Sequence, residues 1–211
     1  PDYPYGIYVE GRLPESECPM AALIGARKCT EYGREFAYKL AQDLGRQGIG
    51  VVSGLAEGID GAGHRGCIDG GGYTLGILGG GIHTIYPKEN YSLYREMKVK
   101  GGIISEYPLP FLFPRRNRLI SALSDFLVVI EAREKSGTLI TVDCALEQGR
   151  NIGAVPGRPC DPLSFGCNRL IQHGAKCILN SEDVLEEFTD SISWKKTEIG
   201  QESVNSDLGL A

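Results

Sequence analysis

Short apolar runs recur along the chain, and glycine-rich or polar turns separate them. Runs without a two-residue alternation are typical of strands that are buried on both faces of a sheet. The pattern predicts such strands at residues 20–26, 49–53, 73–78, 102–106, 126–131, 151–155 and 175–179. A further strand-like piece, Ile7-Tyr8-Val9, precedes them and suits the edge of a sheet.

Segments with a helical period lie between these runs. In residues 32–47, Phe36, Leu40 and Leu44 recur every four residues, and Gly48 follows as a stop signal. Helices are also predicted from the 54–60 turn to Gly70, over 91–100 with Asn90 as a cap, from the arginines at 115–118, and over 136–149, 168–173 and 181–188. Ser181 is the expected N-cap of the last helix.

Strands that alternate with helices of about ten to fifteen residues predict an α/β fold. We expect a Rossmann-like, doubly wound, mostly parallel sheet with helices on both faces and right-handed crossovers. In such a sheet the loops at the carboxyl ends of the strands share one edge, where ligands bind. The loops after residues 25, 53, 78, 106 and 131 should therefore form one rim, and they are rich in Gly, Ser, Thr and Arg.

The predicted organisation is a single core domain with two flanking segments. Residues 1–19 contain four prolines and are predicted to be a lead-in arm. Residues 20–188 carry the strand and helix pattern and form the core. Residues 189–211 are polar and have no period, so we expect a tail or linker there.

Composition and charge limit the classes of function. The chain has 211 residues, of which 29 are glycine, about twice the usual share. A net charge of −5 excludes a polycation that coats nucleic acid. Any nucleic-acid site must therefore be a local patch.

The cysteines and the hydropathy indicate a cytoplasmic protein. The seven cysteines are scattered and include no C-x-x-C pair, as is typical of reduced thiols. Cys160 and Cys167 lie near His173, but their spacing fits no zinc pattern, so we expect no metal and no cofactor. No apolar run approaches the roughly 18 residues that span a bilayer, and no signal peptide opens the chain.

The stretch 113–132 carries the most distinctive chemistry. Arg115, Arg116, Asn117 and Arg118 stand where a helix should begin. Guanidinium groups and free helix N–H groups can converge there on one anion. The turns at 25–27, 53–54, 79–81 and 136–138 should lie on the same rim, and backbone N–H groups in glycine turns also bind anions. We therefore predict a ligand that carries phosphate.

Several enzyme classes fit the sequence poorly. The G-x-G-x-x-G dinucleotide signature does not follow the first strand, and there is no Walker A Gly-Lys-Ser/Thr, so a nicotinamide enzyme or an ATPase is not expected. His64 could be a general base, but a histidine on a helix face is more often structural. Glu106 and Glu131 end strands at the rim, where we expect them to hold the arginines by ion pairing rather than to act as an acid and base.

The order of these motifs resembles the DNA-processing protein A family, also known as DprA or Smf. The resemblance runs from about residue 7 to residue 188. It is carried by Gly25-Ala-Arg27, Ser53-Gly-Leu-Ala-Glu-Gly-Ile-Asp60, Leu78-Gly-Gly-Gly81, Ser105-Glu-Tyr-Pro108, Phe113-Pro-Arg-Arg-Asn-Arg118, Ser136-Gly-Thr138, Val155-Pro-Gly157 and Gly166-Cys-Asn-Arg-Leu-Ile171. It implies a Rossmann-like core that binds single-stranded DNA, forms a homodimer, and protects incoming DNA and loads the RecA recombinase in natural transformation, with no catalytic reaction.

The resemblance also implies a set of DNA-binding residues. By position these are Arg27, Ser53, Gly54, Gly80, Phe113, Arg115, Arg116, Asn117, Arg118, Lys135, Ser136, Gly137 and Thr138. Arginine forks and backbone N–H groups suit phosphates, and Phe113 offers a stacking face to an unpaired base. A family-based guess places the dimer surface on the last strand and helix, at Ile178, Leu179, Val184, Leu185 and Phe188, although these residues could equally form core.

The chain departs from the family pattern in two places. Only residues 109–112 separate the Ser-Glu-Tyr-Pro turn from Phe113, where the family has several more. We expect missing residues there, with a Cα–Cα step near 108–112 well beyond the roughly 3.8 Å of a trans peptide. The helical N-terminal and winged-helix C-terminal domains of many members have no counterpart, so a trimmed chain is expected.

Two other functions remain open from the sequence. One is a nucleoside-monophosphate phosphoribohydrolase of the lysine-decarboxylase-like group, which has a similar glycine-rich rim. That group carries a Pro-Gly-Gly-x-Gly-Thr turn with a catalytic Glu, whereas here Ser136-Gly-Thr138 is followed by no Glu before Glu147. The other is an interaction module whose arginines bind acidic proteins.

Overall fold

The computed structural model describes residues 3–108 and 113–189. One eight-stranded sheet runs through the molecule in the order β1-β5-β4-β3-β2-β6-β7-β8. Seven of its strands are parallel: β2 (Met20–Ile24), β3 (Gly50–Ser53), β4 (Thr74–Leu78), β5 (Gly102–Ser105), β6 (Phe126–Val129), β7 (Asn151–Ala154) and β8 (Lys176–Cys177). The edge strand β1 (Tyr8–Gly11) pairs antiparallel with β5. The predicted fold class is confirmed.

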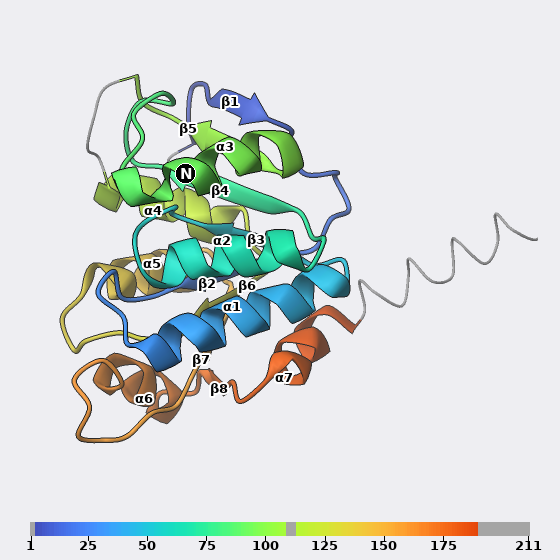
Figure 1. Cartoon of the computed structure of the whole chain (residues 1–211). Coiled ribbons are helices and arrows are strands. Elements are labelled where there is room, and N and C mark those ends of the chain that lie inside the picture. The colour runs from blue at the N-terminus through green and yellow to red at the C-terminus, as the bar shows by residue number, and fades with distance from the viewer. Residues whose placement is uncertain (1–2, 109–112, 190–211) are drawn as a thin grey trace, which may run out of the picture.

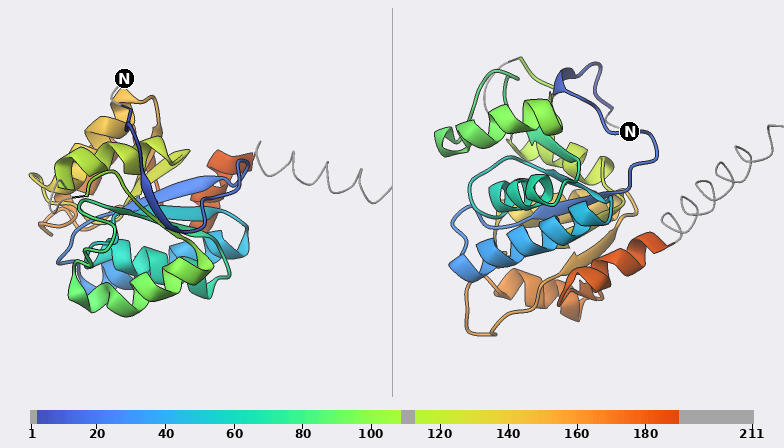
Figure 2. Two further views of the ribbon diagram at one scale, coloured as in Figure 1. Left: turned by 90° about the horizontal axis from the view of Figure 1, so that it is seen from above. Right: turned by 45° about the vertical axis from the view of Figure 1, so that its right-hand side comes forward.

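Helices cover both faces of the sheet (Figure 1). One face carries α1 (Glu31–Arg46), α2 (Ile59–Asp69), the short helix η1 (Lys88–Asn90) with α3 (Tyr91–Lys100), and α7 (Ser181–Leu185) with η2 (Glu186–Phe188). The other face carries α4 (Phe113–Ala122), α5 (Gly137–Glu147) and α6 (Phe165–Gln172). The view from above separates the two helical layers on either side of the strands (Figure 2).

The central strands are apolar throughout because both of their faces are covered. In β2, Ala21 and Leu23 belong to the core beneath α1 and α2. Ala22 and Ile24 belong to the core beneath α4 and α5. Successive side chains of a strand point to opposite faces, so one continuous apolar run supplies two separate cores.

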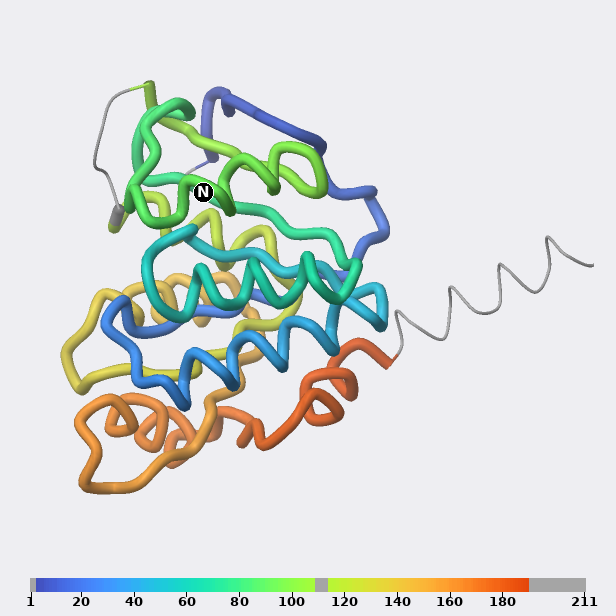
Figure 3. The backbone as a smooth tube through the Cα atoms, viewed as in Figure 1, coloured from blue at the N-terminus to red at the C-terminus, as the bar shows by residue number. Residues whose placement is uncertain are grey.

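The direction of winding reverses between β2 and β6. From β2 the chain proceeds through β3 and β4 to β5 on one side of the sheet, then crosses through α4 to β6 and continues through β7 to β8 on the other side. Figure 3 follows the chain through this reversal. Ligands of doubly wound sheets bind at the carboxyl ends of the strands at such a switch point.

Several details differ from the sequence-based expectations. The last helix is capped by Asn180, which forms a capping box with Asp183, and not by Ser181. Asn90 precedes α3, but its side chain donates hydrogen bonds to the carbonyls of Leu55 and Ala56 instead of capping the helix. The expected break near 108–112 and most of the expected tail at 189–211 lie outside the described residues.

Most of the residues predicted to form the dimer surface belong to the hydrophobic core. Ile178, Val184 and Phe188 are buried beneath α1, and Leu185 packs against the same cluster. Leu179 is 65% exposed. The helix that follows β8 therefore uses its apolar face to cover the sheet.

Candidate nucleic-acid interface

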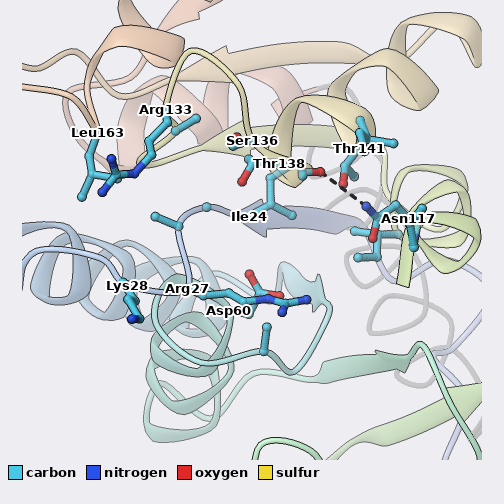
Figure 4. Close-up of a pocket in the computed structure, with 18 of the residues that line it drawn as sticks. Ile24, Arg27, Lys28, Asp60, Asn117, Arg133, Ser136, Thr138, Thr141 and Leu163 are labelled. Atoms are coloured by element: carbon cyan, nitrogen blue, oxygen red, sulfur yellow. Dashed lines mark hydrogen bonds between the residues drawn. The ribbon is translucent and has the colours of Figure 1, made fainter. Parts of the chain in front are cut away.

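A pocket of about 540 Å³ opens at the switch point of the sheet. Its walls come from the loop after β2, the loop after β6 and the first turns of α4 and α5. Figure 4 shows the lining side chains from these segments facing a common space. The pocket therefore lies where the sequence predicted a ligand-binding rim.

Basic side chains and an apolar floor give this pocket a mixed character. Arg27 and Lys28 follow β2, Arg133 follows β6, and all three are exposed residues of the lining. The apolar part of the lining includes Ile24, Ile120, Ala132, Ile140 and Leu163. A charged rim over an apolar floor suits a ligand that has both an anionic and a flat apolar part.

The N-terminus of α5 forms one wall of the pocket. Ser136, Gly137 and Thr138 all line it, and α5 begins at Gly137. The first N–H groups of a helix have no partner within the helix and carry partial positive charge. No acidic residue stands in the first turn, and the hydroxyl oxygen of Ser136 is buried without a hydrogen-bond partner. This end of α5 can therefore accept an anion.

Asn117 connects the two helices at the mouth of the pocket. Its side-chain amide donates to the carbonyl of Gly137 at 3.5 Å, and its amide oxygen accepts from Nε of Arg116 at 3.3 Å. Figure 4 shows the first of these bonds. The arginine-rich first turn of α4 and the glycine turn before α5 thus lie side by side, as the sequence predicted.

Arg116 lines the pocket, although its side chain is nearly buried. Only 4% of the residue is exposed. Its Nη1 donates to the carbonyl of Gly54 at 2.8 Å and also to the carbonyl of Ile77. Its pKa is lowered to about 10, mainly because of burial; the charge of Asp60 opposes the shift and that of Arg27 contributes to it. Arg116 is therefore ionised at neutral pH.

The other two arginines of the motif lie outside the pocket lining. Arg118 forms an ion pair with Glu106 at 2.8 Å, which confirms the expectation that Glu106 holds an arginine. Arg115 is exposed. Phe113 begins α4, and its side chain lies outside the described part of the chain.

Glu131 has a different role from the predicted one. Its carboxylate accepts hydrogen bonds from the N–H of Thr30 at 2.9 Å and from the Thr30 hydroxyl at 2.5 Å. The same hydroxyl accepts from the N–H of Gly33 and caps α1. Glu131 therefore fixes the start of α1 instead of pairing with an arginine.

Four other residues of the predicted set, Ser53, Gly54, Gly80 and Lys135, do not line this pocket. Ser53 is buried and donates to the carbonyl of Leu23 at 2.5 Å, and the carbonyl of Gly80 accepts from Ser105. Gly54 lines a small adjoining hollow together with Arg27. Lys135 faces a separate pocket of about 630 Å³ between α5, β7 and α6. The main pocket thus gathers Arg27, Arg116, Asn117, Ser136, Gly137 and Thr138 from the predicted set.

The predicted set of DNA-binding residues omitted four polar residues of the lining, namely Lys28, Asp60, Arg133 and Thr141. Lys28 and Arg133 could have been predicted by the argument used for Arg27, because each follows a strand at the rim. Asp60 directly follows the 54–60 turn at the start of α2, so its place at the rim could be read from the sequence. Thr141 lies inside α5, where sequence alone does not indicate which face meets the pocket.

His64 is structural. It is fully buried, and its Nδ1 lies 2.6 Å from the hydroxyl of Thr74. That hydroxyl donates to the carbonyl of Val51, so it accepts the Nδ1 proton. Burial and, to a smaller extent, the nearby charge of Arg116 lower the pKa of His64 to about 3. His64 is neutral at physiological pH and does not line the pocket.

The described residues contain neither a cluster of metal ligands nor a membrane-spanning helix. No three His, Cys, Asp or Glu side chains of residues 3–108 and 113–189 gather as metal ligands. Cys167 is buried and donates its thiol proton to the carbonyl of Val129, whereas Cys160 is exposed. Within the same ranges, no helix combines the length and apolar character needed to cross a bilayer.

The fold and the pocket together define an α/β protein with a pocket lined by basic side chains at the switch point of its sheet. More specifically, the chain belongs to the DNA recombination-mediator protein A family, whose sequence model matches residues 1–189. The predicted family is thereby confirmed.

Individual relatives agree with this assignment. The chain is 40% identical to DNA processing protein DprA of Streptococcus pneumoniae over 89% of its length, and 38% identical to Protein Smf of Escherichia coli over 92%. It spans 68% and 53% of those two relatives, respectively.

Solved structures show the same fold. The DprA structure from S. pneumoniae has a TM-score of 0.78 at 38% identity, and the similarity covers 86% of this chain and 65% of that chain. A DprA structure from Helicobacter pylori, described as showing a single-stranded DNA binding mode, has a TM-score of 0.78 at 27% identity and covers 90% and 89%. A molybdenum cofactor binding protein from Rippkaea orientalis shares the fold alone, with a TM-score of 0.60 at 19% identity and coverage of 84% and 99%.

Proposed function

We propose that this protein binds single-stranded DNA in the switch-point pocket and acts as a recombination mediator in natural transformation. In that role it protects incoming DNA and passes it to the RecA recombinase. The observation that carries the proposal is the pocket itself, where Arg27, Lys28 and Arg133 surround an apolar floor beside the N-terminus of α5.

This combination favours an unpaired strand over a duplex. Phosphates are held by basic side chains and helix N–H groups, whatever the sequence of the strand. An apolar floor adds affinity only if a base can leave its stack and enter the pocket. Bases in a duplex are already stacked and paired, so they would need to be flipped out at a cost of a few kcal/mol.

The relatives support the same role. The H. pylori DprA structure concerns single-stranded DNA, and the matching family is described as a recombination mediator. The homodimer and the transfer to RecA rest on resemblance to the family. We propose them for the whole protein, because the chain spans about half to two thirds of its curated relatives.

Among the described residues that line the pocket, the phosphoribohydrolase alternative finds no free catalytic carboxylate. Glu131 is engaged with Thr30, and Glu147 ends α5, about 15 Å along the helix from Gly137. Of the described lining residues, only Asp60 carries a carboxylate, and it is buried and bonded to the N–H of Gly54. We therefore propose binding without a catalytic step.

Fluorescence anisotropy with a labelled oligothymidylate and a labelled duplex tests the proposal. We expect single-strand binding that weakens as salt rises, and weaker binding of the duplex. Release of free base from a nucleoside monophosphate would favour the hydrolase. Binding to an acidic protein without binding to either oligonucleotide would favour the interaction module.

A further inference from the structure

A carboxylate is not expected in the lining of a pocket that binds anions, yet Asp60 lines this one. Asp60 lies at the start of α2 and contributes to the same wall as Arg27 and Arg116. A negative charge beside bound phosphate opposes binding by simple electrostatics. The contacts of Asp60 and Arg116 indicate what the carboxylate contributes instead.

Arg116 joins three elements of the site from beneath. The side chain comes from the first turn of α4, and its guanidinium donates to the carbonyls of Gly54, just after β3, and Ile77, in β4. A planar guanidinium with several fixed donors suits such a bridge, whereas a lysine offers only a point charge. The position of the α4 N-terminus is thereby fixed relative to the ends of two strands.

Asp60 completes this arrangement from the other side of Gly54. Its Oδ2 accepts from the N–H of Gly54 at 3.1 Å. A Cβ at Gly54 would lie 2.6 Å from Nη2 of Arg116 and 2.7 Å from Oδ2 of Asp60, so both side chains pack against that glycine. The charges of Asp60 and Arg116 also interact directly. Each buried charge therefore compensates the other.

The arrangement extends to the mouth of the pocket through Asn117. Nε of Arg116 donates to Asn117, which in turn donates to the carbonyl of Gly137 at the start of α5. A shift of Arg116 would thus move the α4 wall relative to the helix N-terminus that faces the anion.

We propose that Asp60 and Arg116 are positioning residues of the DNA site. They set the spacing between the α4 and α5 walls, and Arg116 supplies no phosphate contact of its own. This inference rests on the proposed function. It assigns to Arg116 and Gly54 a different role from the direct DNA contact that the resemblance implied.

For Asp60→Asn, the direction of the change in DNA affinity distinguishes a positioning role from simple electrostatic repulsion. The substitution keeps the shape of the side chain and removes one negative charge from the pocket wall. Simple electrostatics predicts tighter binding of oligothymidylate, whereas a positioning role predicts weakening by about tenfold. Asp69→Asn is the matched control, because Asp69 is exposed at the opposite end of α2. Circular dichroism at the assay temperature establishes that each variant is folded.

The salt dependence of binding gives an independent readout for Arg116. Loss of one phosphate contact flattens the slope of log affinity against log salt by about 0.7 for a single strand. We expect Arg116→Gln to weaken binding while the slope stays that of the parent. In the double variant Asp60→Asn/Arg116→Gln, binding should be no weaker than in the weaker single variant, because the two residues act as a unit.

If the parent binds oligothymidylate, two results would overturn the inference and leave the proposed function intact. One is an Asp60→Asn variant that binds as tightly as the parent or more tightly. The other is a salt slope in Arg116→Gln that is flatter than that of the parent. A parent that binds no single strand would instead refute the proposed function. If Arg116→Gln does not fold, Asp60→Asn decides alone.

Discussion

Glu131 accepts two hydrogen bonds from Thr30, one from its N–H at 2.9 Å and one from its hydroxyl at 2.5 Å. The two residues are 101 positions apart and follow the two strands that flank the switch point. Their contact fixes the loop of residues 25–30, which carries Arg27 and Lys28. A carboxylate at the rim therefore shapes the basic edge of the pocket without entering it.

Glu131→Gln should destabilise the protein by about 1–3 kcal/mol, because it weakens two charge-assisted hydrogen bonds to a buried group. Urea unfolding followed by circular dichroism measures the change. Glu147→Gln is the control, since Glu147 is exposed at the far end of α5 and should change the free energy of unfolding by less than about 0.5 kcal/mol. Equal stabilities for the two variants would refute this role.

Lys28→Ala and Arg133→Ala should each weaken oligothymidylate binding and flatten its salt slope by about 0.7, the effect of one lost phosphate contact. Anisotropy titrations at several salt concentrations measure both quantities. Lys39→Ala removes an exposed lysine that pairs with Glu35 on α1, and it should leave the slope unchanged. If all three variants flattened the slope alike, binding would depend on overall charge and not on the pocket.

The buried His64 should make the protein less stable as the pH falls. Its pKa in the folded protein is about 3, below the ordinary 6.5, because burial disfavours the charged ring. Between pH 6.5 and 3 the unfolded chain binds a proton that the folded protein excludes, so stability declines across that window. The decline due to His64 between pH 7 and pH 5 is about 2 kcal/mol. His64→Gln should lose about that much less than the parent in urea unfolding at the two pH values, and equal losses would contradict the assignment.

The homodimer prediction now depends on Leu179. Leu185→Glu would disturb core packing, whereas Leu179 is exposed beside the edge strand β8. The parent should have about twice the chain mass of 22.9 kDa in light scattering, and Leu179→Glu should have the mass of a single chain. An unchanged mass in the variant would remove Leu179 from the interface.

The architecture could be predicted from the sequence because the buried strands coincide with short apolar runs. Residues 20–24 and 126–130 are continuous apolar runs, which are typical of strands buried on both faces of a parallel sheet. The order of strands and helices then fixes the winding and places the loops at one edge. Family motifs contributed the residue-level picture of the site.

The roles of single side chains could not be predicted in the same way. The sequence 115–118 does not reveal that Arg116 turns beneath the strand ends while Arg115 stays exposed, because that depends on how α4 packs. Likewise, Phe188 and Val184 are apolar and could belong to an interface or to the core. Only their packing against α1 shows that they belong to the core. These outcomes depend on tertiary packing, which local pattern does not encode.

The most direct test of the central claim places a negative charge in the pocket without disturbing the fold. A Cβ at Gly137 meets no atom within 4 Å, and a glutamate in the first turn of α5 is favourable for the helix. Gly6→Glu makes the same change in equally open space on the N-terminal arm. We predict that Gly137→Glu weakens oligothymidylate binding by at least about tenfold and that Gly6→Glu changes it by less than about twofold. Equal binding by the two variants would contradict a DNA site at the switch point.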